Sequence, residues 1–169
     1  IPSEDVFSSR VSELGISNDH TIVVYAKQGS FSAPRCWWTF RVFGHEEVYV
    51  LDGGFPAWEA SGGRIESGEV KPTSTRPSSG LVQASGNAWK LNAKGFQARL
   101  NAPMLRTWRQ VLSQVEQGNE AVGQIVDARS LARFRAEAPE PRAGLAGGHI
   151  PGSVSLPLTN VLEEGDVTK

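Results

Sequence analysis

The chain has 169 residues, of which 39% are hydrophobic and 21% are charged, a balance that is ordinary for a globular protein and excludes a largely disordered chain. The 17 basic residues are offset by 18 acidic ones, and the net charge of −1 does not indicate binding to nucleic acid or to an anionic membrane surface. No apolar run approaches the roughly 18 residues that a membrane-spanning helix needs.

The first part of the chain predicts a helix followed by a strand, a helix, a strand and a short helix. The continuous apolar run of the first strand suits a parallel sheet that is covered on both faces. A strand, a helix and a strand in succession make a βαβ unit, whose strands are parallel. In chain order, the predicted elements are helix 3–14, strand 21–25, helix 33–43, strand 48–51 and helix 55–60.

The second part repeats the alternation after a segment rich in Ser, Gly, Pro and Thr, which indicates a linker or an extended crossing segment. A helix is predicted where Thr107 and Gln110 fit a capping box. The chain therefore holds two α/β units that separate between residues 65 and 105. The remaining predictions are linker 62–88, helix 107–117, strand 124–127, helix 130–135, loop 136–148, strand 154–156 and a last helix capped by Thr159.

Cysteine usage and the first residue set further limits. The single cysteine, Cys36, excludes an internal disulfide framework and a zinc site built from several cysteines. No spacing of His, Cys or carboxylate residues is typical of a metal site, and we expect no cofactor. No secretory or organellar presequence is visible. Because the sequence begins with Ile1 and not Met, we expect the natural N-terminus to lie upstream.

Two stretches carry motifs of a known family. Residues 23–62 predict a strand, a loop, a helix and a strand, followed by Asp-Gly-Gly and a short helix that contains a tryptophan. Residues 125–158 contain Asp-x-Arg directly after a strand and, later, Gly-His-Ile-Pro-Gly. Both stretches resemble the rhodanese (sulfurtransferase) superfamily. The resemblance implies a rhodanese-like α/β fold, a parallel sheet flanked by helices, made of two incomplete domains joined by a linker.

The two halves occur in inverted order. The first stretch resembles the second half of a rhodanese domain, and the second stretch resembles the first half. We therefore expect a fragment of a tandem two-domain sulfurtransferase. Residues 1–64 would be the C-terminal part of a non-catalytic domain, 65–104 a linker, and 105–169 the N-terminal part of a second, catalytic-type domain. A circularly permuted single domain is the alternative.

Two arginines are candidate substrate ligands. Among tandem members the resemblance is closest to the enzymes that act on 3-mercaptopyruvate, with the thiosulfate enzymes next, and it implies that Arg133 and Arg142 hold the donor's carboxylate and carbonyl. A guanidinium group suits this task because it binds a planar carboxylate with two parallel hydrogen bonds. The alternative is that both arginines are surface charges near Glu137 and Glu140, where exposed pairs contribute about 0–1 kcal/mol.

Four other residues of the motif are expected to be structural. Asp127 and Arg129 follow a strand end and would fix the turn there. His149 could carry a proton, since histidine titrates near neutrality, but the resemblance implies that it supports its loop. Gly152 belongs to the same Gly-His-Ile-Pro-Gly motif.

The family's nucleophile is a cysteine at the head of a loop between a strand and a helix. Here that loop is residues 26–31, and matching Ser32 and Ala33 to the end of the family's loop places Lys27 where the cysteine would be. A lysine cannot carry sulfane sulfur. We therefore expect no catalytic residue in this chain, and the catalytic cysteine in sequence beyond it.

Cys36 is the remaining candidate thiol. Arg35 precedes it, and a neighbouring cation can lower a thiol pKa and create a nucleophile. However, Cys36 lies inside a predicted helix, on one stripe with Phe40 and Phe43, which favours a small buried apolar residue. A redox-active Cys36 is the alternative.

The expected function is transfer of sulfane sulfur from 3-mercaptopyruvate, or thiosulfate, to a thiol or cyanide acceptor through a cysteine persulfide in the complete protein. The resemblance implies a small-molecule donor, a thiol acceptor that includes thioredoxin-like proteins, and a mitochondrial or cytoplasmic location. We expect no nucleic-acid or membrane partner. The alternative is a non-catalytic rhodanese-like module that binds or regulates a partner.

Overall fold

The computed structural model describes residues 1–27, 32–68, 80–84, 87–91, 95–118 and 123–161, with only the backbone described for 80–84 and 87–91. The chain divides into two compact units, Ile1–Leu105 and Arg106–Lys169. Each unit is described by itself below. No helix among the described residues is long and apolar enough to cross a membrane.

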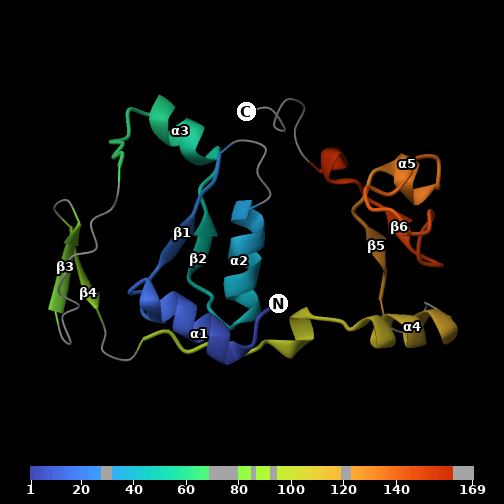
Figure 1. Ribbon diagram of the computed structural model, residues 1–169, viewed down its shortest axis with the longest axis horizontal. Coiled ribbons are helices and arrows are strands. Elements are labelled where there is room, and N and C mark those ends of the chain that lie inside the picture. The colour runs from blue at the N-terminus through green and yellow to red at the C-terminus, as the bar shows by residue number, and fades with distance from the viewer. Residues whose placement is uncertain (28–31, 69–79, 85–86, 92–94, 119–122, 162–169) are drawn as a thin grey trace. The chain divides into compact units, whose positions relative to one another are not determined.

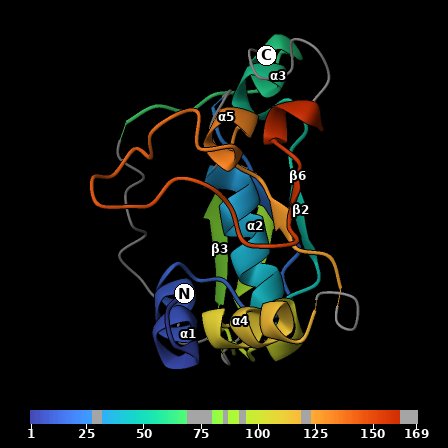
Figure 2. The same cartoon turned by 90° about the vertical axis from the view of Figure 1, so that its right-hand side faces the viewer.

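The first unit contains the predicted βαβ arrangement (Figure 1). Strands β1 and β2 are parallel, with Ile22 opposite Val48, and helix α2 connects them and packs against both. Helices α1 and α3 lie near opposite ends of this strand pair (Figure 2). The elements are α1 Glu4–Glu13, β1 Ile22–Val24, α2 Ser32–Val42, β2 Val48–Val50 and α3 Gly54–Ala60.

An aromatic cluster forms the core of the first unit. The ring of Phe7 on α1 stacks on Phe43 at a centroid distance of 4.4 Å and meets the edges or faces of Phe40 and Phe96 at 5.2 and 5.6 Å. Edge-to-face and offset contacts of this kind add to the stabilisation from burial alone. The buried members of the main core cluster are Val11, Phe40, Val48 and Phe96.

The segment 95–101 packs against earlier parts of the first unit. The Arg99 amide donates to the Phe43 carbonyl oxygen at 3.1 Å, and the Asn101 amide donates to the Val42 carbonyl oxygen at 2.7 Å. This segment falls within the stretch 65–104 that the sequence indicated as a linker. Its hydrogen bonds tie it to the end of α2, and the expected domain boundaries stay a prediction.

The same stretch contains a β-hairpin. Strands β3 (Gly80–Ala84) and β4 (Asn87–Leu91) are antiparallel, with Gly80 opposite Leu91 and Ala84 opposite Asn87. The 3-10 helix η1 (Ala102–Met104) follows. The sequence indicated only an extended or crossing segment for residues 62–88, because Ser, Gly and Pro dominate its composition.

The second unit has a shorter parallel pair. Strands β5 and β6 pair with Val126 opposite Val154. Helix α4 begins after Thr107, whose side chain and that of Gln110 form the predicted capping box. Thr159 lies inside a 3-10 helix and does not begin the predicted last helix; residues after 161 lie outside the described part of the chain. The elements are α4 Trp108–Glu116, β5 Val126–Asp127, α5 Leu131–Phe134, β6 Val154–Ser155 and η3 Leu158–Asn160.

The strand faces are more exposed than the sequence predicted. The side chains of Val23 and Tyr49 remain 56% and 52% exposed, and Val126 and Val154 are also exposed. The continuous apolar runs indicated parallel strands covered on both faces. Among the described residues these side chains therefore lie on a largely uncovered strand face, and coverage of both faces stays a prediction.

Candidate functional site

A turn at the end of β5 carries the first two residues of the site. Asp127 is the last residue of β5, and its Oδ1 accepts a hydrogen bond from the Arg129 amide at 2.9 Å. The Arg129 side chain folds back on the same carboxylate, with Nε 3.0 Å from both carboxylate oxygens and Nη2 2.5 Å from Oδ2. An Asp followed two residues later by Arg therefore closes the turn through both backbone and side chain.

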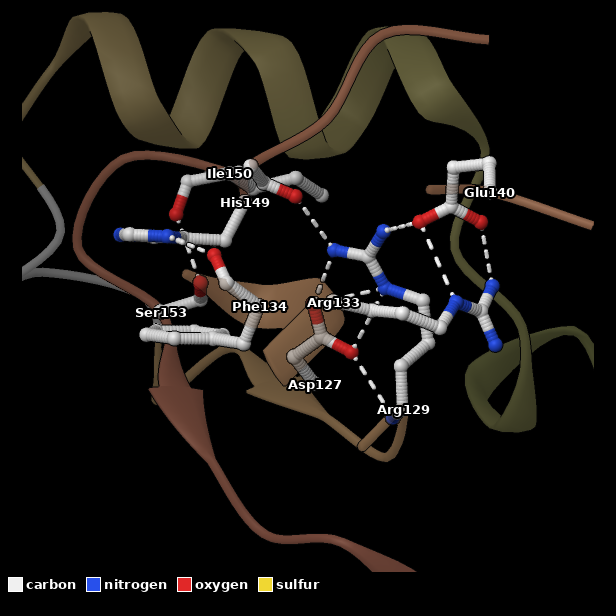
Figure 3. A network of polar contacts seen from close by, with 9 residues as sticks. Asp127, Arg129, Arg133, Phe134, Glu140, His149, Ile150 and Ser153 are labelled. Atoms are coloured by element: carbon white, nitrogen blue, oxygen red, sulfur yellow. Dashed lines mark hydrogen bonds and ion pairs between the residues drawn. The ribbon is translucent and has the colours of Figure 1, made fainter. Parts of the chain in front are cut away.

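Arg129 also fixes the long loop 136–148 (Figure 3). Its Nη1 donates to Glu140 Oε1 at 2.6 Å, and its Nη2 donates to the Gly148 carbonyl oxygen at 2.6 Å. Glu140 lies near the start of this loop and Gly148 at its end. The guanidinium group of Arg129 thus joins the end of β5 to Glu140, near the start of the loop, and to Gly148, at its end.

Arg133 lies on α5 and shares Glu140 with Arg129. Its Nε donates to Glu140 Oε1 at 3.2 Å, and its Nη2 donates to Oε2. The Glu140 side chain is only 6% exposed, whereas the Arg133 side chain is 29% exposed. Arg133 is therefore neither a free cation nor a member of an exposed surface pair.

The charges of the cluster shift the titration of its carboxyl groups. The hydrogen bond from Arg129 lowers the pKa of Asp127, and the hydrogen bond from Arg133, followed by that from Arg129, lowers the pKa of Glu140. The two carboxylates raise the pKa of Arg129, chiefly through the hydrogen bond to Asp127. All these groups stay charged near neutral pH.

His149 supports the loop end. Its Nδ1 lies 2.8 Å from the Phe134 carbonyl oxygen, and its ring stacks on the Phe134 ring at a centroid distance of 3.7 Å and an interplanar angle of 7°. Gly152 has φ 75°, which an L side chain would strain. These contacts support the expected structural roles of His149 and Gly152, which stay predictions.

Arg142, the second expected substrate ligand, lies on the surface of the loop. Its side chain is exposed, and no described residue forms a hydrogen bond or ion pair with it. Arg133 is thus bound to a nearly buried carboxylate, whereas the side chain of Arg142 is exposed to solvent.

The loop of residues 26–31, where the family resemblance places the nucleophile, is described only at Ala26 and Lys27. Lys27 is exposed, and residues 28–31 lie outside the described part of the chain. The carbonyl oxygen of Ala26 accepts a hydrogen bond from the Phe55 amide at 3.0 Å. A Cβ at Gly54 would lie only 2.4 Å from that oxygen. The absence of a side chain at Gly54 therefore allows the start of α3 to lie close to the chain that follows β1.

Cys36 does not occupy the buried position that the helical stripe predicted. Phe40 and Phe43 are buried, but Cys36 is exposed. Partial desolvation raises the pKa of its thiol. The neighbouring Arg35 guanidinium lies 4.5 Å from the centre of the Trp38 ring. The thiol thus lacks the lowered pKa of an activated nucleophile.

Glu140 is the residue of the site that the sequence did not single out. From the sequence, Glu140 was expected only as a possible partner in an exposed ion pair. A glutamate between Pro139 and Pro141, seven residues after Arg133, was the available signal. Among the described residues, no group of three or more His, Cys, Asp or Glu side chains could hold a metal ion.

Residues 2–61 match the family described as rhodanese-like domain. The chain is 41% identical over 165 residues to thiosulfate/3-mercaptopyruvate sulfurtransferase 1, mitochondrial, of Arabidopsis thaliana, covering 96% of this chain and 43% of the relative. Residues 2–61 are therefore identified as a rhodanese-like region. This confirms the resemblance inferred from the two motif-bearing stretches and the α/β fold class that it implied.

Other relatives agree with this rhodanese assignment. Thiosulfate sulfurtransferase of Bos taurus is 41% identical over 172 residues, covering 100% of this chain and 50% of the relative. The crystal structure of a 3-mercaptopyruvate sulfotransferase from Escherichia coli matches with a TM-score of 0.69 and 31% identity, covering 100% of this chain and 55% of that structure. The chain thus spans about half the length of the curated relatives it matches.

Proposed function

We propose that the protein containing this chain is a sulfurtransferase that moves sulfane sulfur from 3-mercaptopyruvate, or from thiosulfate, to a thiol or cyanide. The relatives named above carry these activities in their names. The observation that carries the proposal to this chain is Arg133, whose guanidinium is oriented by Glu140 and has an Nη1 to which no described residue is bonded.

In this proposal, Arg133 and Arg142 bind the donor and a cysteine outside the chain carries the sulfur. A thiolate attacks the sulfur of 3-mercaptopyruvate, and the C–S bond breaks with its electrons leaving on the pyruvate enolate, which then takes up a proton. The acceptor thiolate next attacks the outer persulfide sulfur and releases the enzyme thiolate. Two guanidinium groups suit a planar 2-keto acid because they offer several directed N–H donors.

The acceptor and the compartment follow the same proposal. A thiol acceptor, including thioredoxin-like proteins, and a mitochondrial or cytoplasmic location fit a small-molecule sulfurtransferase. One relative is named as mitochondrial. We further propose that His149, Gly152, Asp127 and Arg129 hold the donor site in shape without touching the reacting atoms.

Steady-state kinetics of the complete protein test the roles of the two arginines. In a thiocyanate-release assay with 3-mercaptopyruvate and cyanide, Arg133→Met and Arg142→Met should each raise KM for the donor. The expected rise is about 10- to 100-fold, because a hydrogen bond to a charged group contributes about 1.5–3 kcal/mol. The matched control is Arg135→Met, since Arg135 is exposed and pairs only loosely with the exposed Glu137 at 3.9 Å.

Unchanged donor KM values in both variants would contradict this assignment. Absence of thiocyanate release by the complete protein would instead favour the second candidate, a non-catalytic rhodanese-like module that binds a partner. The specific observation behind that candidate is Lys27 at the place expected for a sulfur-carrying cysteine.

A further inference from the structure

We propose that Glu140 is a positioning residue that sets the orientation of Arg133 toward the sulfur donor. This inference rests on the proposed role of Arg133 as a donor ligand. It assigns Glu140 a function beyond closing its loop, namely to decide which edge of the Arg133 guanidinium is available to a bound carboxylate.

Glu140 is itself held in place by an independent partner. Its Oε1 accepts a hydrogen bond from Arg129 at 2.6 Å, and Arg129 is in turn fixed by Asp127 and by the Gly148 carbonyl oxygen. The Glu140 side chain is 94% removed from solvent, and its carboxylate is held from the β5 side by Arg129 (Figure 3). An immobile carboxylate can orient a second, more exposed side chain.

The contacts with Arg133 use one edge of its guanidinium. Glu140 accepts from Nε and Nη2 of Arg133, which is the side edge of the group. The end edge, formed by Nη1 and the outer N–H of Nη2, stays available, and the Nη1 atom points away from Glu140 in Figure 3. A guanidinium group offers a bidentate fork on each edge, so the end edge can still bind a carboxylate with two hydrogen bonds.

The charge balance of the cluster suggests different roles for the two proposed donor ligands, Arg133 and Arg142. Asp127 and Glu140 offset Arg129 and Arg133, so the four side chains together carry no formal net charge. Of the two proposed ligands, Arg142 is therefore the one whose positive charge no described carboxylate offsets. Arg133 contributes direction, because its donors are aimed by a fixed carboxylate and need not be ordered when the substrate binds.

A double-mutant cycle in the complete protein tests this role. Glu140→Gln should raise KM for 3-mercaptopyruvate about tenfold and leave kcat within about twofold, the pattern of lost binding that is equal in ground and transition states. In an Arg133→Met background the same change should alter KM by less than about twofold, because the side chain that Glu140 orients is absent. Glu137→Gln is the matched control, since Glu137 is a 59% exposed glutamate of the same region.

The outcomes separate the inference from the function on which it rests. Equal KM effects of Glu140→Gln in both backgrounds, or none in either, would overturn the positioning role while leaving Arg133 as a ligand. An Arg133→Met variant with unchanged KM would overturn both. If Glu140→Gln does not fold, Glu140→Asp replaces it in the cycle, because it keeps the charge but is too short to reach both guanidinium groups.

Discussion

Arg129 and Arg133 are equally charged but differ in how many of their donors are already used. Arg129 gives its donors to Asp127, Glu140 and the Gly148 carbonyl oxygen, and none of its nitrogens is left without a bond. Arg133 bonds Glu140 alone and keeps Nη1 available. At the residue scale, this difference separates a structural arginine from a candidate ligand better than sequence position does.

Acid should loosen the loop that these residues hold. The arginines lower the pKa of both Asp127 and Glu140 in the folded chain, below unfolded values of about 3.9 and 4.3. Their stabilising contribution is therefore fully present above about pH 5 and is lost as the pH falls through the lowered values. Amide hydrogen exchange at 125–149, corrected for intrinsic rates, should accelerate between about pH 5 and pH 3.

Helix α2 provides the control for this experiment, since Ser32–Val42 contains no carboxylate. Its amides should keep their protection over the same pH range. Equal acceleration in α2 and in the loop would point to global unfolding and contradict a local effect of the ion-pair cluster.

The sequence identified the arginines of this cluster but not its geometry. Asp-x-Arg at a strand end predicted the contact between Asp127 and Arg129, which the structure contains. Glu140 and Gly148 could not be placed, because their contacts depend on how the loop 136–148 folds back. From the sequence, Arg133 was expected to be either a substrate ligand or a member of an exposed ion pair. In the structure it pairs with the nearly buried Glu140 and still has one edge of its guanidinium group available.

At the scale of elements, two helices of the second unit begin with a hydroxyl residue but are capped differently. The Gln110 amide donates to Thr107 Oγ1 at 3.3 Å, and the Thr107 amide donates to Gln110 Oε1 at 2.7 Å. Ser130 occupies the N-cap position of α5 but forms no capping hydrogen bond through its side chain. Substitutions of Thr107 and Ser130 can therefore be compared, because both residues occupy an N-cap position and only Thr107 forms a side-chain capping hydrogen bond.

Thr107→Ala should reduce the stability of α4 by about 0.5–2 kcal/mol, because it leaves an amide at the helix start without its side-chain acceptor. Ser130→Ala should change the stability of α5 by much less, as no such bond is lost. Amide hydrogen exchange within Trp108–Glu116 and Leu131–Phe134 measures both effects. A loss for Ser130→Ala as large as that for Thr107→Ala would contradict the difference in capping.

Local sequence signals predicted the elements well and their burial less well. Ser3 caps α1, accepting from the Val6 amide, and Thr107 caps α4 as predicted. Periodicity placed Cys36 on the stripe of Phe40 and Phe43, yet Cys36 is exposed while Phe40 and Phe43 are buried. Spacing along a helix defines a face, but how far neighbouring elements cover that face depends on tertiary contacts.

At the scale of the whole chain, the first unit is closed by residues from its far end. Phe96 is 2% exposed and packs on Phe7 and Phe40, which lie much earlier in the sequence. Composition could not reveal this contact, because it depends on one aromatic residue that follows a long stretch typical of a linker. The hydrogen bonds of Arg99 and Asn101 to the end of α2 extend the same attachment.

Phe96→Ala should destabilise the first unit by about 3–5 kcal/mol, the usual effect of removing a buried phenylalanine ring. Leu100→Ala lies in the same segment but removes an exposed side chain, so it should change stability by less than about 0.5 kcal/mol. Denaturant unfolding followed by the hydrogen exchange of α1 and α2 amides compares the two variants. Equal effects would mean that residues 95–101 act only as a linker.

The exposed position of Cys36 makes this thiol a handle for spectroscopy. It is the only cysteine in the 169 residues, so a maleimide fluorophore would label the chain at one position, slowly at neutral pH because the pKa of the thiol is raised. The neighbouring Trp37 is fixed by a hydrogen bond of 2.9 Å from its Nε1 to the Val48 carbonyl oxygen. Separation of α2 from β2 would break this bond and change the surroundings of a dye on the neighbouring Cys36, which the emission of the dye would report.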